Sequence, residues 1–365
     1  MQAEAPIRDG PETATVETET PSTTGAELTL SFHGVGVAVA SDDSELLDAV
    51  RHTFAYFAAA AEPIELRIEH RSAKPDYDAL PELTRSVATP RNITFFADGV
   101  NYIDYFGRAL NVYDARRGLA RVTTDDPHLA REIVYLTVLS RVAERLAARG
   151  IHRIHALGLE LGGRAALVLL PSGGGKSTLA LSILRDADNG LRLISEDSPL
   201  VRRDGWLLPF PLRIGVHPQN LPEGIEARFT RFERRMEFEP KVSIDVTLFA
   251  DRLAREPVPP GLILLGRRTT ARDSRIVPVA KRRVTRHILM NSVVGIGLYQ
   301  GLEFILQRGL GDVAAHAATA LSRSRGAFQL VRKSRVYEFV IGRDRRLNFE
   351  TLLRFLAAEQ PPSTR

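Results

Sequence analysis

Alternating apolar and polar positions predict a group of short strands in the first part of the chain. The pattern over residues 28–40, interrupted by two glycines, predicts one or two strands, and residues 43–60 have the apolar spacing of an amphipathic helix. Residues 75–91 are polar and contain several prolines, which predicts a loop. Further strand patterns, separated by turn residues, cover residues 64–69, 93–96, 100–105 and 109–113.

A long helical pattern closes this group and predicts a domain boundary. Residues 127–149 repeat apolar positions at helical spacing, and either Asp125 or Asp126 can cap the first turn. Gly150 follows the last turn, where a left-handed residue commonly ends a helix. We therefore expect a small α+β domain over residues 28–149.

Residues 150–359 mix strand and helix patterns, which predicts a second, α/β domain with a mixed sheet. Two apolar runs, 155–161 and 164–170, flank Gly162 and Gly163. This pair favours a two-residue hairpin turn, because both turn positions require a positive φ. Further strand patterns cover residues 191–195, 261–265, 275–279, 328–332 and 337–341. Helical patterns cover residues 284–297, 302–308, 312–322 and 348–357.

The composition is that of a globular protein and excludes several classes of function. The 365 residues are 44% hydrophobic and 25% charged, which is enough for one large core or for two. The chain contains no Cys, so disulfides, thiolate metal sites and a Cys nucleophile are excluded. Apolar runs stay far below the roughly 20 residues that cross a bilayer. We expect a cytoplasmic protein without a membrane partner.

The charge is unevenly distributed along the chain. Residues 1–27 contain six acidic residues and one Arg and are rich in Thr and Pro, which predicts a disordered acidic tail; residues 360–365 form a second tail. Because the whole chain is +5 and the first tail is −5, the remainder is +10. This surplus suits phosphate-bearing or acidic partners. The basic residues are interspersed with acids, which argues against a nucleic-acid partner and leaves homo-oligomers open.

A glycine-rich segment joins the apolar run that ends at Leu170 to an amphipathic helix. Consecutive glycines let backbone N–H groups converge, Lys176 can reach terminal phosphates, and the Ser177 hydroxyl can ligate Mg²⁺. The segment is typical of a phosphate-binding loop, although Leu170 stands where the usual pattern has Gly. A glycine-rich turn with an exposed Lys is the alternative. The candidate nucleotide-binding residues are Ser172, Gly173, Gly174, Gly175, Lys176, Ser177 and Thr178.

Two carboxylates and a His are candidate catalytic residues. Glu196 and Asp197 follow the apolar run 191–195, and at the end of a strand beside the loop they can reach Mg²⁺ or accept a proton from an attacking hydroxyl. A solvated strand end is the other interpretation. If the two glycines form the hairpin turn, the numbers of cross-strand partners sum to 325, and His155 faces Leu170. An imidazole there can orient a nucleophile or pair with phosphate, or it can be structural.

The order of these features resembles the catalytic domain of bacterial HPr kinase/phosphorylase and related HPr-kinase-like proteins, which share a nucleotide-binding core with ATP-dependent phosphoenolpyruvate carboxykinases. The resemblance covers about residues 150–215, with Glu196 and Asp197 where that family usually has two Asp. It implies an ATP-dependent kinase with a P-loop fold, in which Glu196 is the general base, Asp197 lies nearer the metal and His155 assists. The family's stretch beyond the carboxylates is missing, and residues 28–145 do not resemble its N-terminal domain, so HPr is not the expected substrate.

We therefore expect transfer of the γ-phosphoryl group of ATP to a Ser or Thr hydroxyl of a peptide or protein. Similar stand-alone kinases modify ribosomally made peptides, including lasso peptides. A small-molecule kinase with the same site, or a non-catalytic ATP-binding regulatory or assembly protein, are the alternatives. Arg213 and His217 are candidate substrate residues if their strand passes the site. The charged and aromatic residues 219–241 suit a lid, a peptide-binding segment or a solvated helix.

Overall fold

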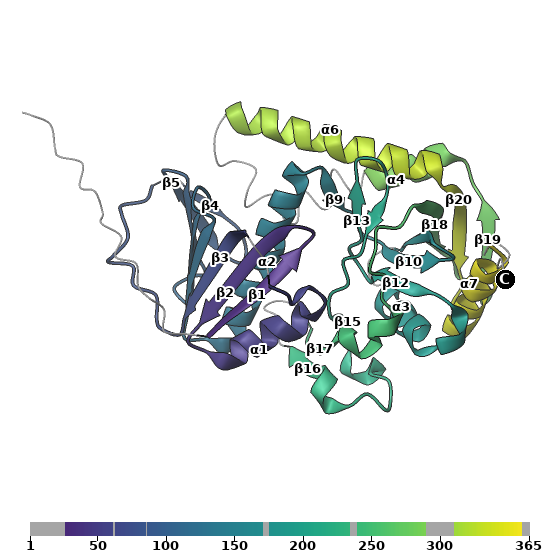
Figure 1. Ribbon diagram of the computed structural model, residues 1–365, viewed down its shortest axis with the longest axis horizontal. Helices are drawn as coiled ribbons and strands as arrows, with labels where there is room; N and C mark the ends of the chain where they lie inside the picture. Colours follow the sequence, from purple (N-terminus) through teal and green to yellow (C-terminus); the bar gives the residue numbers. More distant parts are fainter. Residues whose placement is uncertain are drawn as a thin grey trace, which may run out of the picture.

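Two large β-sheets, one from each half of the chain, organise the fold. The computed structural model describes residues 26–60, 63–84, 86–170, 175–233, 239–289 and 310–359. Within these ranges the protein is mixed α/β, as predicted, and the two sheets lie side by side in Figure 1. Of the predicted tails, residues 1–25 and 360–365 lie outside the described ranges, whereas Ala26 and Glu27 already belong to the first strand.

The first sheet has eight strands: β1 (Ala26–Phe32), β2 (Val35–Ser41), β3 (Ile64–Arg71), β4 (Ser86–Ala88), β5 (Ile93–Ala97), β6 (Val100–Asp104), β7 (Leu110–Asp114) and β8 (Leu119–Thr123). Their spatial order is β1-β2-β3-β8-β7-β6-β5-β4. β3 is parallel to both of its neighbours, and the other pairs are antiparallel.

Two helices pack on one face of this sheet. α1 (Ser44–Thr53) begins after Asp43, and α2 (Pro127–Ala148) begins after Asp126; both Asp side chains accept hydrogen bonds from the N–H groups of the first turn. The predicted cap of α2 is therefore confirmed. Apolar side chains of both helices join those of β1, β2, β3 and β8 in one core.

The second sheet has six strands: β10 (Leu157–Leu161), β11 (Arg164–Leu169), β12 (Arg192–Ser195), β18 (Pro260–Arg268), β19 (Arg275–Pro278) and β20 (Arg335–Ile341). Their spatial order is β12-β10-β11-β18-β20-β19. β11, β18 and β20 are parallel, and β12 runs the same way because β11 and β12 both pair antiparallel with β10. The carboxyl ends of these four strands therefore meet at one edge of the sheet, which is the edge where open α/β sheets bind ligands.

Helices cover both faces of the second sheet, and two small sheets adjoin it. α3 (Lys176–Arg185) and α7 (Arg345–Glu359) share a core with one face, and α4 (Lys281–Leu289) and α6 (Leu310–Lys333) share a core with the other. The small sheets are β15 (Ile214–Val216), β17 (Lys241–Ile244) and β16 (Thr230–Glu233), packed beside α3, and β14 (Leu207–Leu208), β13 (Leu200–Arg202) and β9 (Ile151–Arg153).

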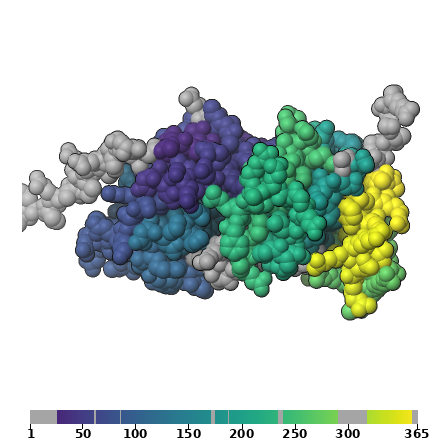
Figure 2. Space-filling view, turned by 90° about the horizontal axis from the view of Figure 1, so that it is seen from below, coloured from purple at the N-terminus to yellow at the C-terminus, as the bar shows by residue number. Residues whose placement is uncertain are grey.

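The two halves of the chain pack directly against each other. β13 contributes Leu200 to the core of the first sheet and Val201 to a core of the second, as its alternating side chains allow. The ring of Phe210 lies 5.1 Å from that of Phe57, between centroids, and extends the contact. Figure 2 shows the purple-to-blue first half against the green residues of the second. None of the described helices is both long and apolar enough to cross a bilayer.

One predicted strand is wrong, one predicted helix is too long, and several strands were missed. Residues 328–332, predicted as a strand, belong to α6, because Ala327, Leu330 and Val331 have helical spacing and pack on the second sheet. The helix predicted over 43–60 ends at Thr53, where Phe54 leaves helical geometry and becomes buried in the core. Strands β4, β8, β9, β16 and β17 have no counterpart in the predicted elements. The helix predicted over 302–308 and the end of that over 284–297 lie outside the described residues.

Candidate functional site

The carboxyl end of β11 leads into the glycine-rich segment. Partners in the β10–β11 hairpin sum to 325, as in the pair Leu157 and Val168, so the predicted register is confirmed. Pro171 and the candidate residues Ser172, Gly173 and Gly174 lie outside the described residues. The described chain resumes at Gly175, which precedes α3 with a left-handed φ of 89°, a conformation that glycine adopts without strain.

Leu170, the residue that differs from the usual loop pattern, is buried against β18. Its side chain occupies the space beside Gly266, where an added Cβ would lie 2.5 Å from Leu170 Cδ2 and 3.0 Å from the Leu169 carbonyl oxygen. Leu170 is 5% exposed. An apolar anchor in the core therefore replaces the flexible glycine at the start of the loop.

Lys176, the first residue of α3, lies at the centre of a cluster of polar side chains. It is 7% exposed, and its Nζ lies 3.0 Å from His155 Nε2 and 3.3 Å from the Leu170 carbonyl oxygen. The same nitrogen is 3.6 Å from Asp197 Oδ1, which in turn is 3.1 Å from His155 Nδ1. The structure thus brings together His155, Lys176 and Asp197. The β10–β11 ladder ends at the pair Leu157 and Val168, so His155 does not pair with Leu170 across the hairpin as predicted, although Lys176 Nζ contacts both residues.

Ser177 and Glu196 form the second pair of this cluster. The Ser177 hydroxyl donates a 2.5 Å hydrogen bond to Glu196 Oε1, which joins the start of α3 to the end of β12. Burial, together with the negative charge of Asp197, raises the pKa of Glu196 from 4.5 to about 7, although the Ser177 bond and the charges of Lys176 and Lys241 oppose that rise. A carboxylate with a pKa near neutrality is suited to accept a proton at physiological pH.

The described part of the cluster has too few ligands to hold a metal ion by protein side chains alone. Among the described residues, no group of three or more His, Asp or Glu side chains is placed to hold an ion. The Ser177 hydroxyl and the Asp197 carboxylate, which is 41% exposed, can supply one ligand each. This donor set fits Mg²⁺, which usually keeps several waters and is held by one or two protein oxygens together with substrate phosphates. Thr178 follows on the exposed side of α3.

Arg213 and His217, the candidate substrate residues, make their contacts elsewhere. Arg213 Nε lies 2.8 Å from Glu233 Oε1, its Nη1 donates to the Thr53 hydroxyl, and its guanidinium lies 4.2 Å from the centre of the Tyr135 ring. It therefore links β15 to the first half of the molecule. His217 Nδ1 is 3.5 Å from Glu239 Oε2 on the exposed side of the same segment.

Lys241 is a cation near the site that the sequence did not single out. It begins β17, and its side chain runs across Gly215 of β15, where an added Cβ would lie 3.3 Å from Lys241 Cδ. Its charge acts on Glu196. Within the sequence it was one of many charged residues in 219–241, and only the pairing of β15 with β17 brings it toward the carboxylates.

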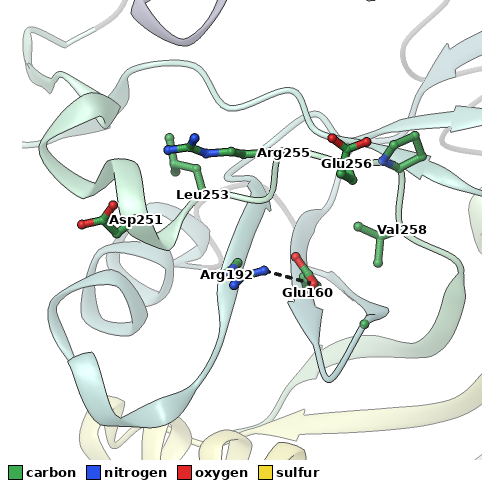
Figure 3. A pocket seen from close by; sticks show the side chains of 9 residues that line it. Glu160, Arg192, Asp251, Leu253, Arg255, Glu256 and Val258 are labelled. Atoms are coloured by element: carbon green, nitrogen blue, oxygen red, sulfur yellow. Dashed lines mark ion pairs between the residues drawn. The ribbon is translucent and has the colours of Figure 1, made fainter.

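A hollow of about 450 Å³ lies away from this cluster, at the opposite edge of the second sheet (Figure 3). It adjoins the hairpin turn at Gly163 and contains an ion pair between Glu160 Oε1 and Arg192 Nη1, 3.6 Å apart. Its other charged residues, Asp251, Arg255 and Glu256, have both signs. The polar cluster at the carboxyl edge is thus separate from this hollow.

No protein-family model matches the chain, and no curated protein matches it either.

Proposed function

We propose that the protein is an ATP-dependent kinase of the HPr-kinase-like type, with the P-loop core of the phosphoenolpyruvate carboxykinases, that phosphorylates a Ser or Thr-type hydroxyl of a peptide or protein. The supporting observation is the cluster at the carboxyl edge. Lys176 and Ser177, at the start of α3, lie within hydrogen-bond or ion-pair distance of the carboxylates that follow β12. Groups that can bind phosphate (a cation, backbone N–H groups and a hydroxyl) thus lie next to a carboxylate that can accept the proton of the acceptor hydroxyl.

The residues divide the work between binding and proton transfer. Lys176 neutralises phosphate oxygens, and the first-turn N–H groups of α3 add donors. Ser177 and Asp197 hold Mg²⁺, which neutralises charge on the phosphates when bound. Glu196 takes the proton of the acceptor hydroxyl while the oxygen of that hydroxyl bonds to the γ-phosphorus. The bond from the γ-phosphorus to the bridging oxygen breaks at the same time, and ADP leaves with its electron pair. His155 orients Lys176 and Asp197 through its two ring nitrogens.

The experiment that tests this function separates binding from transfer. The full chain is incubated with Mg²⁺ and γ-labelled ATP in the presence of a pool of Ser/Thr peptides or a pool of metabolites. Lys176→Ala should abolish both ATP binding and labelling. Glu196→Gln should keep ATP binding and lose transfer by roughly 100-fold or more, because it removes only the base.

Glu160→Gln is the matched control, since it removes a half-buried carboxylate at the opposite edge of the same sheet. It should label acceptors at the wild-type rate. Label confined to metabolites would make the protein a small-molecule kinase. A chain that binds ATP without transferring phosphate, and whose ATP affinity Glu196→Gln leaves unchanged, would refute the kinase function and support a regulatory or assembly role.

A further inference from the structure

A second hollow opens on the exposed side of α3. Its volume is about 370 Å³, and it is lined by Thr178, Leu181, Ser182, Arg185, Asp186, Asn220 and Pro222. The lining residues of α3 are three or four positions apart and therefore share one face of the helix. The face extends from the first turn to the last, which at ~1.5 Å per residue is about 10 Å. The hollow thus begins beside the start of α3 and runs along the helix.

The walls of this hollow are fixed by packing on both sides. Leu181 is 3% exposed and belongs to the core beneath α3. Opposite it, Leu221 and Ile225 anchor the segment after β15 to the same core. The Arg185 guanidinium donates a 3.2 Å hydrogen bond to the Glu223 carbonyl oxygen and ties the two walls together. Packing and this hydrogen bond therefore hold the two walls of the hollow at a fixed separation.

The chemistry of the lining suits a flat ring with a polar edge. Leu181 and Pro222 supply apolar surface, and the Ser182 hydroxyl is already bonded to the Thr178 carbonyl oxygen at 2.9 Å. Within the described residues, the Thr178 hydroxyl and the Asn220 amide have no hydrogen-bond partner. An Asn amide offers one donor and one acceptor group, the pair that matches the adenine edge.

We propose that this hollow holds the nucleoside half of an adenine nucleotide whose phosphates lie at the start of α3. The inference rests on the proposed function and extends it by assigning the base to residues outside the catalytic cluster. The base lies between the α3 face and Pro222, and the Asn220 amide bonds its edge. The Thr178 hydroxyl faces the sugar. The hollow adjoins the start of α3, and its lining combines two apolar residues, Leu181 and Pro222, with five polar or charged ones that can fix the orientation of a ligand.

The test compares two ligands that share phosphates and differ in the nucleoside. Binding of Mg²⁺-ATP and of Mg²⁺-tripolyphosphate is measured by titration calorimetry on the full chain. Ser182→Trp places an indole in the hollow, and Asp188→Trp places one on an exposed position outside it. Asn220→Ala removes only the amide. We expect Ser182→Trp to weaken ATP binding at least 10-fold and Asn220→Ala to weaken it about 5-fold. Neither substitution should change the affinity for tripolyphosphate by more than about 2-fold, and Asp188→Trp should leave the affinity for both ligands unchanged.

Each outcome decides the assignment. Retained tripolyphosphate binding shows that a variant is folded around an intact phosphate site. Wild-type affinity for ATP in Ser182→Trp would overturn the inference while leaving the proposed function in place. An unchanged ATP affinity in Asn220→Ala would overturn the role of the amide in reading the base. A wild-type chain that binds neither ligand would refute the proposed function, and the nucleoside assignment with it.

Discussion

The raised pKa of Glu196 predicts a stability change with pH that a single substitution should remove. Burial keeps this carboxyl protonated in the folded chain up to about pH 7, whereas the unfolded chain releases the proton near pH 4.5. Between these two values the folded state binds more protons than the unfolded state, so rising pH favours unfolding. The destabilisation is absent below pH 4.5 and complete above pH 7. Glu196→Gln cannot ionise and should lack it.

The size of the effect follows from the two pKa values. At about 1.4 kcal/mol per pH unit, the interval from 4.5 to about 7 corresponds to about 3 kcal/mol in the free energy of unfolding. Relative to Glu196→Gln, the wild-type chain should therefore lose about 3 kcal/mol between pH 4 and pH 8.5. The Gln side chain can still accept the Ser177 hydrogen bond, so the variant preserves the contact between α3 and the end of β12.

Urea denaturation of the nucleotide-free protein at a series of pH values measures this difference directly. The wild-type curve should approach that of the variant at low pH and separate from it through pH 7. Glu160→Gln serves as control, because it removes a carboxylate from the same sheet at the opposite edge. A wild-type and a Glu196→Gln curve that stay parallel across the whole range would refute the claim that this carboxyl is held protonated.

Two further substitutions test packing and the contact between the halves. Gly266→Ala would place a Cβ 2.5 Å from Leu170 Cδ2. We therefore expect the free energy of unfolding, measured by thermal denaturation, to fall by about 1–3 kcal/mol, and ATP binding to weaken. Unchanged stability would contradict the anchoring of the loop start by Leu170. Arg213→Met leaves Glu233, which is 18% exposed, without its cation, so we expect about 2–3 kcal/mol of destabilisation in urea, rescued by the double variant that also carries Glu233→Gln.

Local sequence patterns predicted the parts of the site that lie on one hairpin. Two glycines predicted the turn and the turn predicted the register, which the pairs from Leu157–Val168 to Leu161–Arg164 confirm; the ladder stops before His155 and Leu170. The adjacency of Glu196 to the start of α3 also followed, because parallel strands bring their carboxyl ends to one edge. Lys241 could not be found in this way, since its place depends on the pairing of β17 with β15, which no local pattern encodes.

The errors in the fold have the same origin in long-range packing. Residues 328–332 were predicted as a strand, but burial of Leu330 and Val331 against the second sheet selects a helix. Arg213 was a candidate substrate residue only if its strand passed the site. In the folded chain Glu233 and Thr53 bind it at the junction of the two halves, a contact between residues far apart in sequence.

The members of the polar cluster bind one another, and this constrains how a ligand can bind. Lys176 contacts His155 and Asp197, and the Ser177 hydroxyl donates to Glu196. A hydroxyl has one donor hydrogen and two acceptor lone pairs, so Ser177 can keep its hydrogen bond to Glu196 while its oxygen faces a bound cation, as the proposed function requires. That bond lowers the pKa of Glu196 and so opposes the rise that burial and Asp197 cause. One hydrogen bond therefore joins the residue proposed to hold the donor to the residue proposed to accept the proton.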